Sequence, residues 1–213
     1  MRPPESWRRA RLTLAIAAIT SIAWLIPNLL GWSEIAAIWG GFIPARIGGM
    51  EGDALLAPAL LTPFTATLVH ASLAHLAFNV LILLFCGRAT ENIIGGPGLL
   101  ILYLVGALVA AAAHYAMDPF DRTPMVGASG AISAVIGTYA ILFGRNRVKV
   151  ANPTLALWVN ALWLAAAWVG IQLITGLTFE TAGVRVAIAA HIGGFLTGLL
   201  LAKPLLMLRY RKA

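Results

Sequence analysis

Long runs without a charged side chain are the feature of this sequence that most limits its fold. Only 11% of the 213 residues are charged and 60% are hydrophobic, whereas soluble proteins carry about 25% charged residues. Most of this chain is therefore expected to face lipid. Six uncharged runs can each hold the roughly 20 residues that cross a bilayer, the last one if Lys203 reaches the interface. They are 12–33, 54–87, 92–117, 123–144, 150–179 and 186–202.

We therefore predict an all-α membrane protein whose single domain, residues 12–207, is a bundle of six transmembrane helices. The spans are expected near 12–31, 69–87, 97–117, 127–144, 153–175 and 185–205. A basic N-terminal segment (1–11) and a basic tail (208–213) flank this domain. The shorter run 35–45 contains two glycines and a proline, and we expect it to lie at the interface or to re-enter. The first run is longer than the apolar core of a secretory signal, about 7–15 residues, which favours an uncleaved span.

The distribution of charge predicts the orientation of the bundle. With six spans both termini lie on one side, and that side holds twelve of the fifteen basic residues, against six of the eight acidic residues on the other. The positive-inside rule then places both termini in the cytoplasm. The net charge of +7 predicts no nucleic-acid partner, because the basic residues lie where orientation and anionic lipid headgroups favour them. The single cysteine, Cys86, excludes an intramolecular disulfide and argues against a structural zinc site.

Polar side chains gather at one depth of the predicted bundle, in the three spans that enter from the outer face. They are His70, Ser72, His75 and Asn79 in span two, Ser129 and Ser133 in span four, and His191 in span six. At 1.5 Å per residue these groups lie roughly 5–12 Å below the surface. Intramembrane polar groups are costly and usually face the bundle interior, so this cluster is a candidate functional site.

Helix periodicity places a serine and a histidine on the smoothest faces of their helices. The residues are His191, Gly194 and Gly198 at i, i+3 and i+7 of span six, and Ser129, Ser133 and Gly137 at i, i+4 and i+8 of span four. Such faces let backbones approach closely, and the hydroxyl and the imidazole come within hydrogen-bonding range if the two faces meet. A neutral imidazole beside a serine activates it as a nucleophile.

Each of these residues taken alone has a structural explanation. A lone Ser129 can bond back to the carbonyl one turn earlier, and GASGA (127–131) can be a helix-packing motif of small residues. A lone intramembrane histidine is as readily a partner in an interhelical hydrogen bond as a functional group. The conjunction of several such groups at one depth favours a catalytic site.

A serine nucleophile also needs donors for the oxyanion of its tetrahedral intermediate. His75 and Asn79 are spaced i, i+4 and share a face of span two, and the backbone N–H of Ser129 is a third candidate. Gly127 belongs to the same supporting group. No Asp or Glu lies inside a span, so we expect a Ser–His dyad that has no acidic third member and needs no cofactor.

Two other kinds of site fit the spacing less well. The nucleophile elbow of an esterase reads G-x-S-x-G, whereas Ala131 stands two residues after Ser129 and no βα pattern surrounds it. A metal site would favour histidines at i, i+4 of one helix. His70 and His75 are five residues apart and would diverge by about 140° on a helix, so we predict no metal.

These motifs together resemble the rhomboid family of intramembrane serine proteases. The matching stretches are HASLAHLAFN (70–79), GASGA (127–131) and AHIGGFLTG (190–198), in the family's order and on its helices. The resemblance implies that Ser129 is the nucleophile and His191 the general base. It further implies an oxyanion hole formed by the Ser129 main chain, His75 and Asn79, with His70 in support.

Two positions depart from the family's pattern. The family usually has an aromatic residue four positions after the nucleophile, whose ring packs against the catalytic imidazole, whereas this chain has Ser133. Many members carry a Trp-Arg pair in the first outer loop, whereas Trp39 and Arg46 are separated here. Glu91, in contrast, matches a structural glutamate of the family.

The expected function is that of an intramembrane serine endopeptidase in a bacterial inner membrane, which cleaves transmembrane segments near the outer face. Its partners would be transmembrane substrates and the lipid bilayer. Ser133 leaves open an alternative, a weakly active or inactive rhomboid-like protein that binds membrane helices. A small transporter is disfavoured, because the polar groups are confined to the outer third of the bundle.

Overall fold

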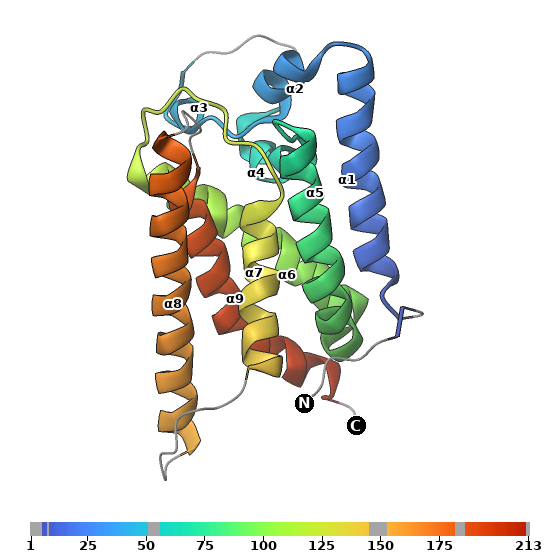
Figure 1. Cartoon of the computed structure of the whole chain (residues 1–213), viewed down its shortest axis with the longest axis vertical. Coiled ribbons are helices and arrows are strands. Elements are labelled where there is room, and N and C mark those ends of the chain that lie inside the picture. The colour runs from blue at the N-terminus through green and yellow to red at the C-terminus, as the bar shows by residue number, and fades with distance from the viewer. Residues whose placement is uncertain (1–5, 8, 51–55, 145–152, 182–185, 212–213) are drawn as a thin grey trace.

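The structure, a computed structural model, describes residues 6–7, 9–50, 56–144, 153–181 and 186–211. These residues form helices joined by loops, and an isolated antiparallel bridge pairs Phe42 with Met125. The central helices are α6 (Arg88–Met117), α7 (Ser129–Phe143) and α9 (Ile188–Arg209), while α1 (Arg11–Leu29) and α8 (Pro153–Thr181) lie at opposite edges (Figure 1). The predicted all-α class is confirmed for the described part of the chain.

The helices α7 and α9 contact one another backbone to backbone. A Cβ atom on Gly194 would overlap the carbonyl oxygen of Gly130, and one on Gly198 would overlap the carbonyl oxygen of Ala134. The buried hydroxyl of Thr138 donates a hydrogen bond of 2.9 Å to the carbonyl oxygen of Gly198. The glycine face of α9 therefore lies directly on α7.

A helical run of 45 residues, Leu73–Met117, consists of α5 (Leu73–Ile82), a π-helical turn (Leu83–Gly87) and α6. A straight helix of this length would measure about 68 Å, roughly twice the thickness of the hydrocarbon core. Gly95 interrupts the run with a φ of 80°, which suits glycine because a side chain is strained there. The interruption falls between the predicted spans 69–87 and 97–117.

The first helix is attached to the core through Glu91 of α6. Its carboxylate accepts hydrogen bonds from the backbone N–H groups of Leu12 (3.0 Å) and Thr13 (2.8 Å) and from the Thr13 hydroxyl (2.7 Å). Those two N–H groups belong to the first turn of α1, where no intrahelical acceptor is available and an anion is favoured. The buried Glu91 carboxylate of α6 thus caps the N-terminus of α1.

Several boundaries differ from the predicted ones. Where the structure describes it, the chain between α1 and α5 forms short helices: α2 (Ser33–Gly40), α3 (Pro44–Ile47), α4 (Thr62–Thr65) and the 3₁₀ turns Ala59–Leu61 and Ala66–Leu68. Helix α5 begins at Leu73, because the hydroxyl of Ser72 caps it by accepting from the N–H of His75 at 3.1 Å. Helices α8 and α9 end at Thr181 and Arg209, beyond the predicted residues 175 and 205.

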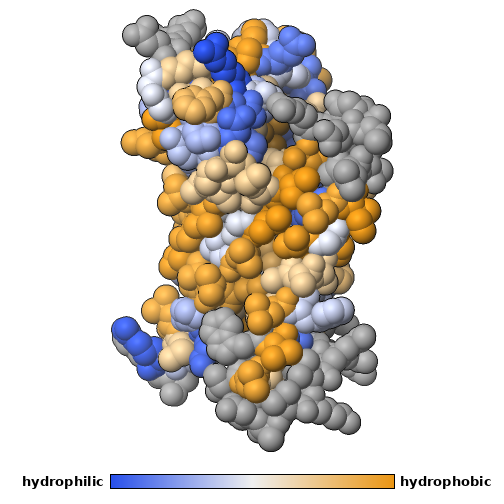
Figure 2. Space-filling view, turned by 90° about the vertical axis from the view of Figure 1, so that its left-hand side faces the viewer, coloured by the Kyte–Doolittle hydropathy of each residue, from blue (hydrophilic) through white to orange (hydrophobic). Residues whose placement is uncertain are grey.

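The surface of the bundle is that of an integral membrane protein. In the described residues, Arg11–Leu29, Leu73–Met117 and Ile188–Arg209 are long and apolar enough to cross a membrane. Large side chains such as Phe78, Leu162 and Leu200 are more than 60% exposed. Hydrophobic residues cover the middle of one face and hydrophilic residues gather toward its two ends (Figure 2). Exposed apolar area of this extent marks a surface that contacts lipid or another protein.

Candidate active site

A tight turn presents Ser129 at the first residue of α7. Gly127 has a φ of 115° and donates its N–H to the carbonyl oxygen of Ala66 at 2.9 Å. A Cβ atom on Gly127 would lie 2.6 Å from Cε1 of the His75 ring. Glycine is therefore required at position 127 both by the backbone conformation and by the imidazole packed against it.

The hydroxyl of Ser129 lies 2.7 Å from Nε2 of His191, which is in the first turn of α9. Both side chains are half-buried. The contact follows from the close packing of α7 and α9, since Gly194 stands one turn after His191 on the face that touches α7. The structure thus brings together the two residues predicted as nucleophile and base.

The other nitrogen of His191 has a partner that the sequence analysis did not identify. Nδ1 lies 2.7 Å from Oε1 of Gln172, a residue of α8 that is 6% exposed. Gln172 is the only glutamine of the chain and lies within the uncharged run 150–179. An amide in an apolar span is a signal of a functional or packing role, but Asn160 in the same run gives the same signal.

A second pair of side chains joins α8 to α9 beside this hydrogen bond. The indole of Trp168 stacks on the ring of Phe195, with centroids 5.0 Å apart and an interplanar angle of 11°. The indole N–H also donates to the carbonyl oxygen of His191 at 3.3 Å. Trp168 and Gln172 are spaced i, i+4, as are His191 and Phe195, so one face of each helix makes both contacts.

Of the predicted oxyanion side chains, His75 lies beside the turn before Ser129, and Asn79 lies one turn further along α5. The ring of His75 packs on Gly127, as described above, and the side-chain amide of Asn79 donates to the carbonyl oxygen of His75 at 2.8 Å. Asn79 Oδ1 is buried without a hydrogen-bond partner. The backbone N–H of Ser129 is at a helix start and has no intrahelical acceptor. The structure therefore places the His75 ring of α5 against the turn that leads into Ser129.

His70 lies in the loop before α5. The assumption that His70 and His75 lie on one helix, on which their expected divergence rested, is therefore wrong. The two imidazoles of His70 and His75 do not diverge, because only His75 is helical; their ring centroids are 4.9 Å apart at an interplanar angle of 62°. His70 Nε2 accepts from the N–H of Ala128 at a long 3.4 Å. Among the described residues, no group of three or more His, Cys, Asp or Glu is arranged to hold a metal ion.

Ser133, where an aromatic residue is usual in the resembled family, is 2% exposed. Its hydroxyl donates to the carbonyl oxygen of Ser129, one turn earlier in the same helix, at 2.7 Å. The Ser133 hydroxyl therefore makes its hydrogen bond within α7 and not to His191. The side chain that anchors the His191 ring comes from α8 instead.

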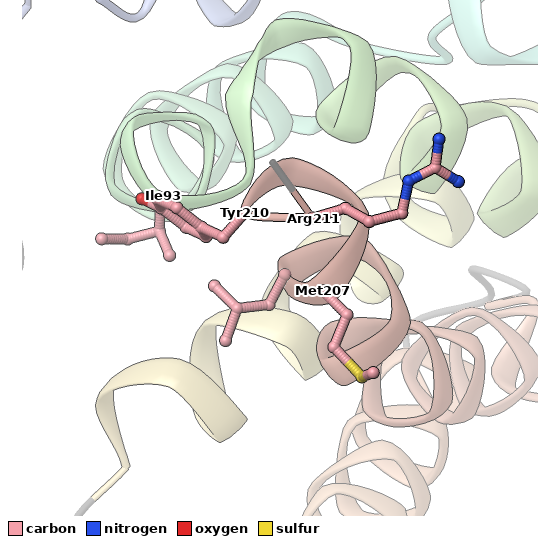
Figure 3. Close-up of a pocket in the computed structure, with 5 residues that line it drawn as sticks. Ile93, Met207, Tyr210 and Arg211 are labelled. Carbon is pink, nitrogen blue, oxygen red and sulfur yellow. The ribbon is translucent and has the colours of Figure 1, made fainter. Parts of the chain in front are cut away.

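An open pocket lies far from these residues, at the end of the bundle where α9 terminates (Figure 3). It is lined by Ile93, Leu206, Met207, Tyr210 and Arg211. Leu206 is fifteen residues after His191 on the same helix, which corresponds to about 22 Å along its axis. This pocket is therefore separate from the Ser129–His191 pair.

Comparisons with known proteins agree with the motifs. A family model described as the Rhomboid domain matches residues 58–208. Rhomboid protease GlpG of Pectobacterium atrosepticum is 30% identical over 193 residues, which are 90% of this chain and 61% of that protein. Rhomboid protease GluP of Bacillus subtilis is 31% identical over 146 residues, 68% of this chain and 25% of that protein. This chain therefore spans less than two thirds of the length of these relatives.

The match to the Rhomboid domain contains Ser129, His191 and Gln172 as well as His70 and His75. It covers every helix from the 3₁₀ turn at Ala59 to α9. The resemblance noted from three short motifs is confirmed over most of the chain. The chain belongs to the rhomboid family.

Proposed function

We propose that this protein is an intramembrane serine endopeptidase that cleaves transmembrane segments of other membrane proteins near the outer face. The observation that carries the proposal is the distance of 2.7 Å between Ser129 Oγ and His191 Nε2. Two relatives named as rhomboid proteases support the same activity. A serine hydroxyl beside an imidazole in an apolar bundle is the arrangement that activates a nucleophile.

The chemistry follows from the positions of the two side chains. His191 Nε2 accepts the Ser129 proton as Oγ attacks the peptide carbonyl carbon, and it later returns that proton to the leaving amine. Water then attacks the acyl-enzyme with the same imidazole as base. The developing oxyanion would be stabilised by the Ser129 backbone N–H and by side-chain N–H groups of His75, whose ring packs on Gly127, and of Asn79.

We also propose six crossings with both termini in the cytoplasm. The crossings are α1, the two halves of Leu73–Met117 on either side of Gly95, α7, α8 and α9. The first residue of α1 and the last of α9 lie at the same end of the bundle, the lower end in Figure 1. Ser129 is the first residue of α7 and His191 lies in the first turn of α9, and both helices run from there toward the lower end in Figure 1, so water would reach the pair from the outer face.

Substrates of such a site are transmembrane helices that unwind locally. A helical carbonyl is already hydrogen-bonded within its own segment, and a membrane offers no water to replace that bond. Segments with glycine and other residues of low helix propensity expose a carbonyl at a smaller free-energy cost. We therefore expect cleavage at small-residue positions near the outer end of a substrate helix.

The test is cleavage of a single-span reporter by the purified protein in proteoliposomes. Ser129→Ala and His191→Ala are each expected to lower the rate by more than about 10³-fold, as removal of one member of such a unit does. A serine-directed fluorophosphonate should label the wild type and neither variant. Equal product from wild type and Ser129→Ala would exclude proteolysis by this site and favour a non-catalytic protein that binds membrane helices.

A further inference from the structure

Gln172 contacts the nitrogen of His191 that faces away from Ser129. The two hydrogen bonds, Gln172 Oε1 to Nδ1 and Ser129 Oγ to Nε2, are both 2.7 Å long and hold opposite edges of one ring. The amide is buried on α8, and the stacked pair Trp168–Phe195 fixes the register of α8 on α9 one turn away. The imidazole is thus held between α7 and α8.

The chemistry of an amide oxygen determines the tautomer of the ring. Oε1 can only accept, so Nδ1 must carry the proton and Nε2 must present a lone pair to the serine hydroxyl. A neutral imidazole with the opposite tautomer would donate toward Ser129 and could not act as a base. The hydrogen bond made by one ring nitrogen therefore selects the state that the other nitrogen needs.

The described residues offer no other side chain for this task. Among the residues that the structure describes, no carboxylate is hydrogen-bonded to His191, and Ser133 donates its hydroxyl to its own helix. The other titratable group that acts on the His191 ring is His75 of α5, whose own ring contacts that of His70. The hydrogen-bond partner of His191 Nδ1 is Gln172.

We propose that Gln172 is the positioning residue of the general base, so that the site works as a Ser–His–Gln unit. The proposal rests on the proposed function, in which His191 is that base. Gln172 holds the ring orientation and the Nδ1-protonated tautomer, and its carbonyl dipole stabilises the imidazolium that forms during acylation. Being neutral, it does so more weakly than a carboxylate would.

The test compares Gln172→Leu with Gln172→Glu in the full-length protein. The leucine variant removes the acceptor at similar volume, and we expect kcat to fall roughly 10- to 100-fold with little change in KM. Its pH–rate profile should shift its acid limb to lower pH, because the imidazolium loses a stabilising dipole. The glutamate variant keeps an acceptor, so kcat should remain near that of the wild type and the acid limb should move to higher pH.

Asn160 provides a matched control, since it is also a buried amide of α8, 6% exposed, but lies about 18 Å from Gln172 along the helix. Asn160→Leu should change neither kcat nor the pH profile. If Gln172→Leu and Gln172→Glu lose the same activity with an unshifted profile, Gln172 only supports the fold and the proposal is overturned.

A readout that needs no turnover separates this proposal from the proposed function. In ¹⁵N-histidine NMR spectra at neutral pH, with the His191 signals assigned by their loss in His191→Ala, Nδ1 should be the protonated nitrogen. Gln172→Leu should convert this into a mixture of tautomers, and Gln172→Glu should not. A wild-type His191 protonated at Nε2 would overturn the positioning role even in an active protease. The expected tautomer in a protein without protease activity would leave Gln172 as the positioning residue and overturn only the proposed function.

Discussion

Helix α9 meets its two neighbours in different ways. Against α7 it presents Gly194 and Gly198, whose Cα atoms lie on the backbone of the facing helix. Against α8 it presents the side chains of His191 and Phe195, which meet those of Gln172 and Trp168. The α7–α9 contact is between backbones and needs glycine on α9, whereas the α8–α9 contact is between specific side chains.

The two contacts meet two different requirements of the site, the distance between Ser129 and His191 and the orientation of the His191 ring. The backbone contact sets the distance between α7 and α9, and with it the 2.7 Å between Ser129 and His191. The side-chain contact sets how the imidazole is turned within that space. Substitutions on the α7 side should therefore affect folding and activity together, whereas substitutions on the α8 side should affect activity with less effect on stability.

Among substitutions outside the Ser129–His191 pair, the largest effect is expected from Gly198→Ala. The added methyl group would overlap the carbonyl oxygen of Ala134 and approach the backbone nitrogen of Thr138 to 2.9 Å. Because backbone atoms cannot rotate away, the helices must separate. We expect a loss of about 1–3 kcal/mol in the free energy of unfolding and of about 100-fold in cleavage rate, since a 1 Å displacement misaligns the reacting groups.

The control for this experiment is Gly170→Ala on α8. A Cβ atom at Gly170 has no atom within 4 Å, so this variant should keep its activity and change in stability by no more than about 1 kcal/mol. Unfolding in mixed detergent and SDS micelles measures the stability of both. Equal losses for the two variants would show that glycine matters for helix flexibility rather than for the α7–α9 contact.

A smaller effect is expected from Trp168→Leu, which removes the stacking partner of Phe195 and the donor to the His191 carbonyl. Aromatic pairs contribute about 0.5–1.5 kcal/mol beyond their buried area, so we expect a three- to tenfold fall in cleavage rate. Trp163→Leu is the matched control, because that indole is 66% exposed on the same helix. If both tryptophan variants behave alike in the reporter assay, the stack does not hold α8 in register.

Thr138→Val should have a still smaller effect, on stability. The variant removes the hydrogen bond from Thr138 to the Gly198 carbonyl, and interhelical hydrogen bonds in membranes contribute about 0.6 kcal/mol. Thr197→Val removes a hydrogen bond of the same length, 2.9 Å, made within α9 to Gly193. A loss for Thr138→Val that exceeds the loss for Thr197→Val would assign the difference to the contact between helices; the reverse order would contradict it.

The α7–α9 half of the site could be read from the sequence because glycine and serine spacing defines a face. Ser129, His191, Gly194 and Gly198 follow helical periodicity, and small residues have few roles in a membrane helix other than close packing. The charged residues Arg88 and Glu91 separate two uncharged runs and so predicted two spans, and Gly95 interrupts the helix between them. In both cases the spacing of residues along a short stretch of sequence was enough to make the prediction.

The contact between α8 and α9 could not be predicted from residue spacing. Helix α8 is apolar on all sides, so periodicity does not say which face meets α9. Its two buried amides, Asn160 and Gln172, lie twelve residues apart and thus about 120° apart around the helix, and only tertiary packing selects one of them. The start of α5 at Leu73 does not follow from charge, because an uncharged run has no internal boundary, whereas the Ser72 cap sets the first residue of the helix.

Ser133→Ala should have the smallest effect and tests whether the Ser133 hydroxyl helps to orient the His191 imidazole. The hydroxyl of Ser133 bonds to the Ser129 carbonyl within α7, a bond that contributes little to helix stability. If the α8 contact holds the imidazole, removing this hydroxyl should change the cleavage rate by less than about twofold, or about 0.4 kcal/mol. Ser21→Ala removes the same kind of bond on α1, to Ala17 at 2.8 Å, and should match it. A tenfold loss in Ser133→Ala alone would mean that the ring of His191 depends on α7 for its orientation, and the contrast between the two faces of α9 would then not hold.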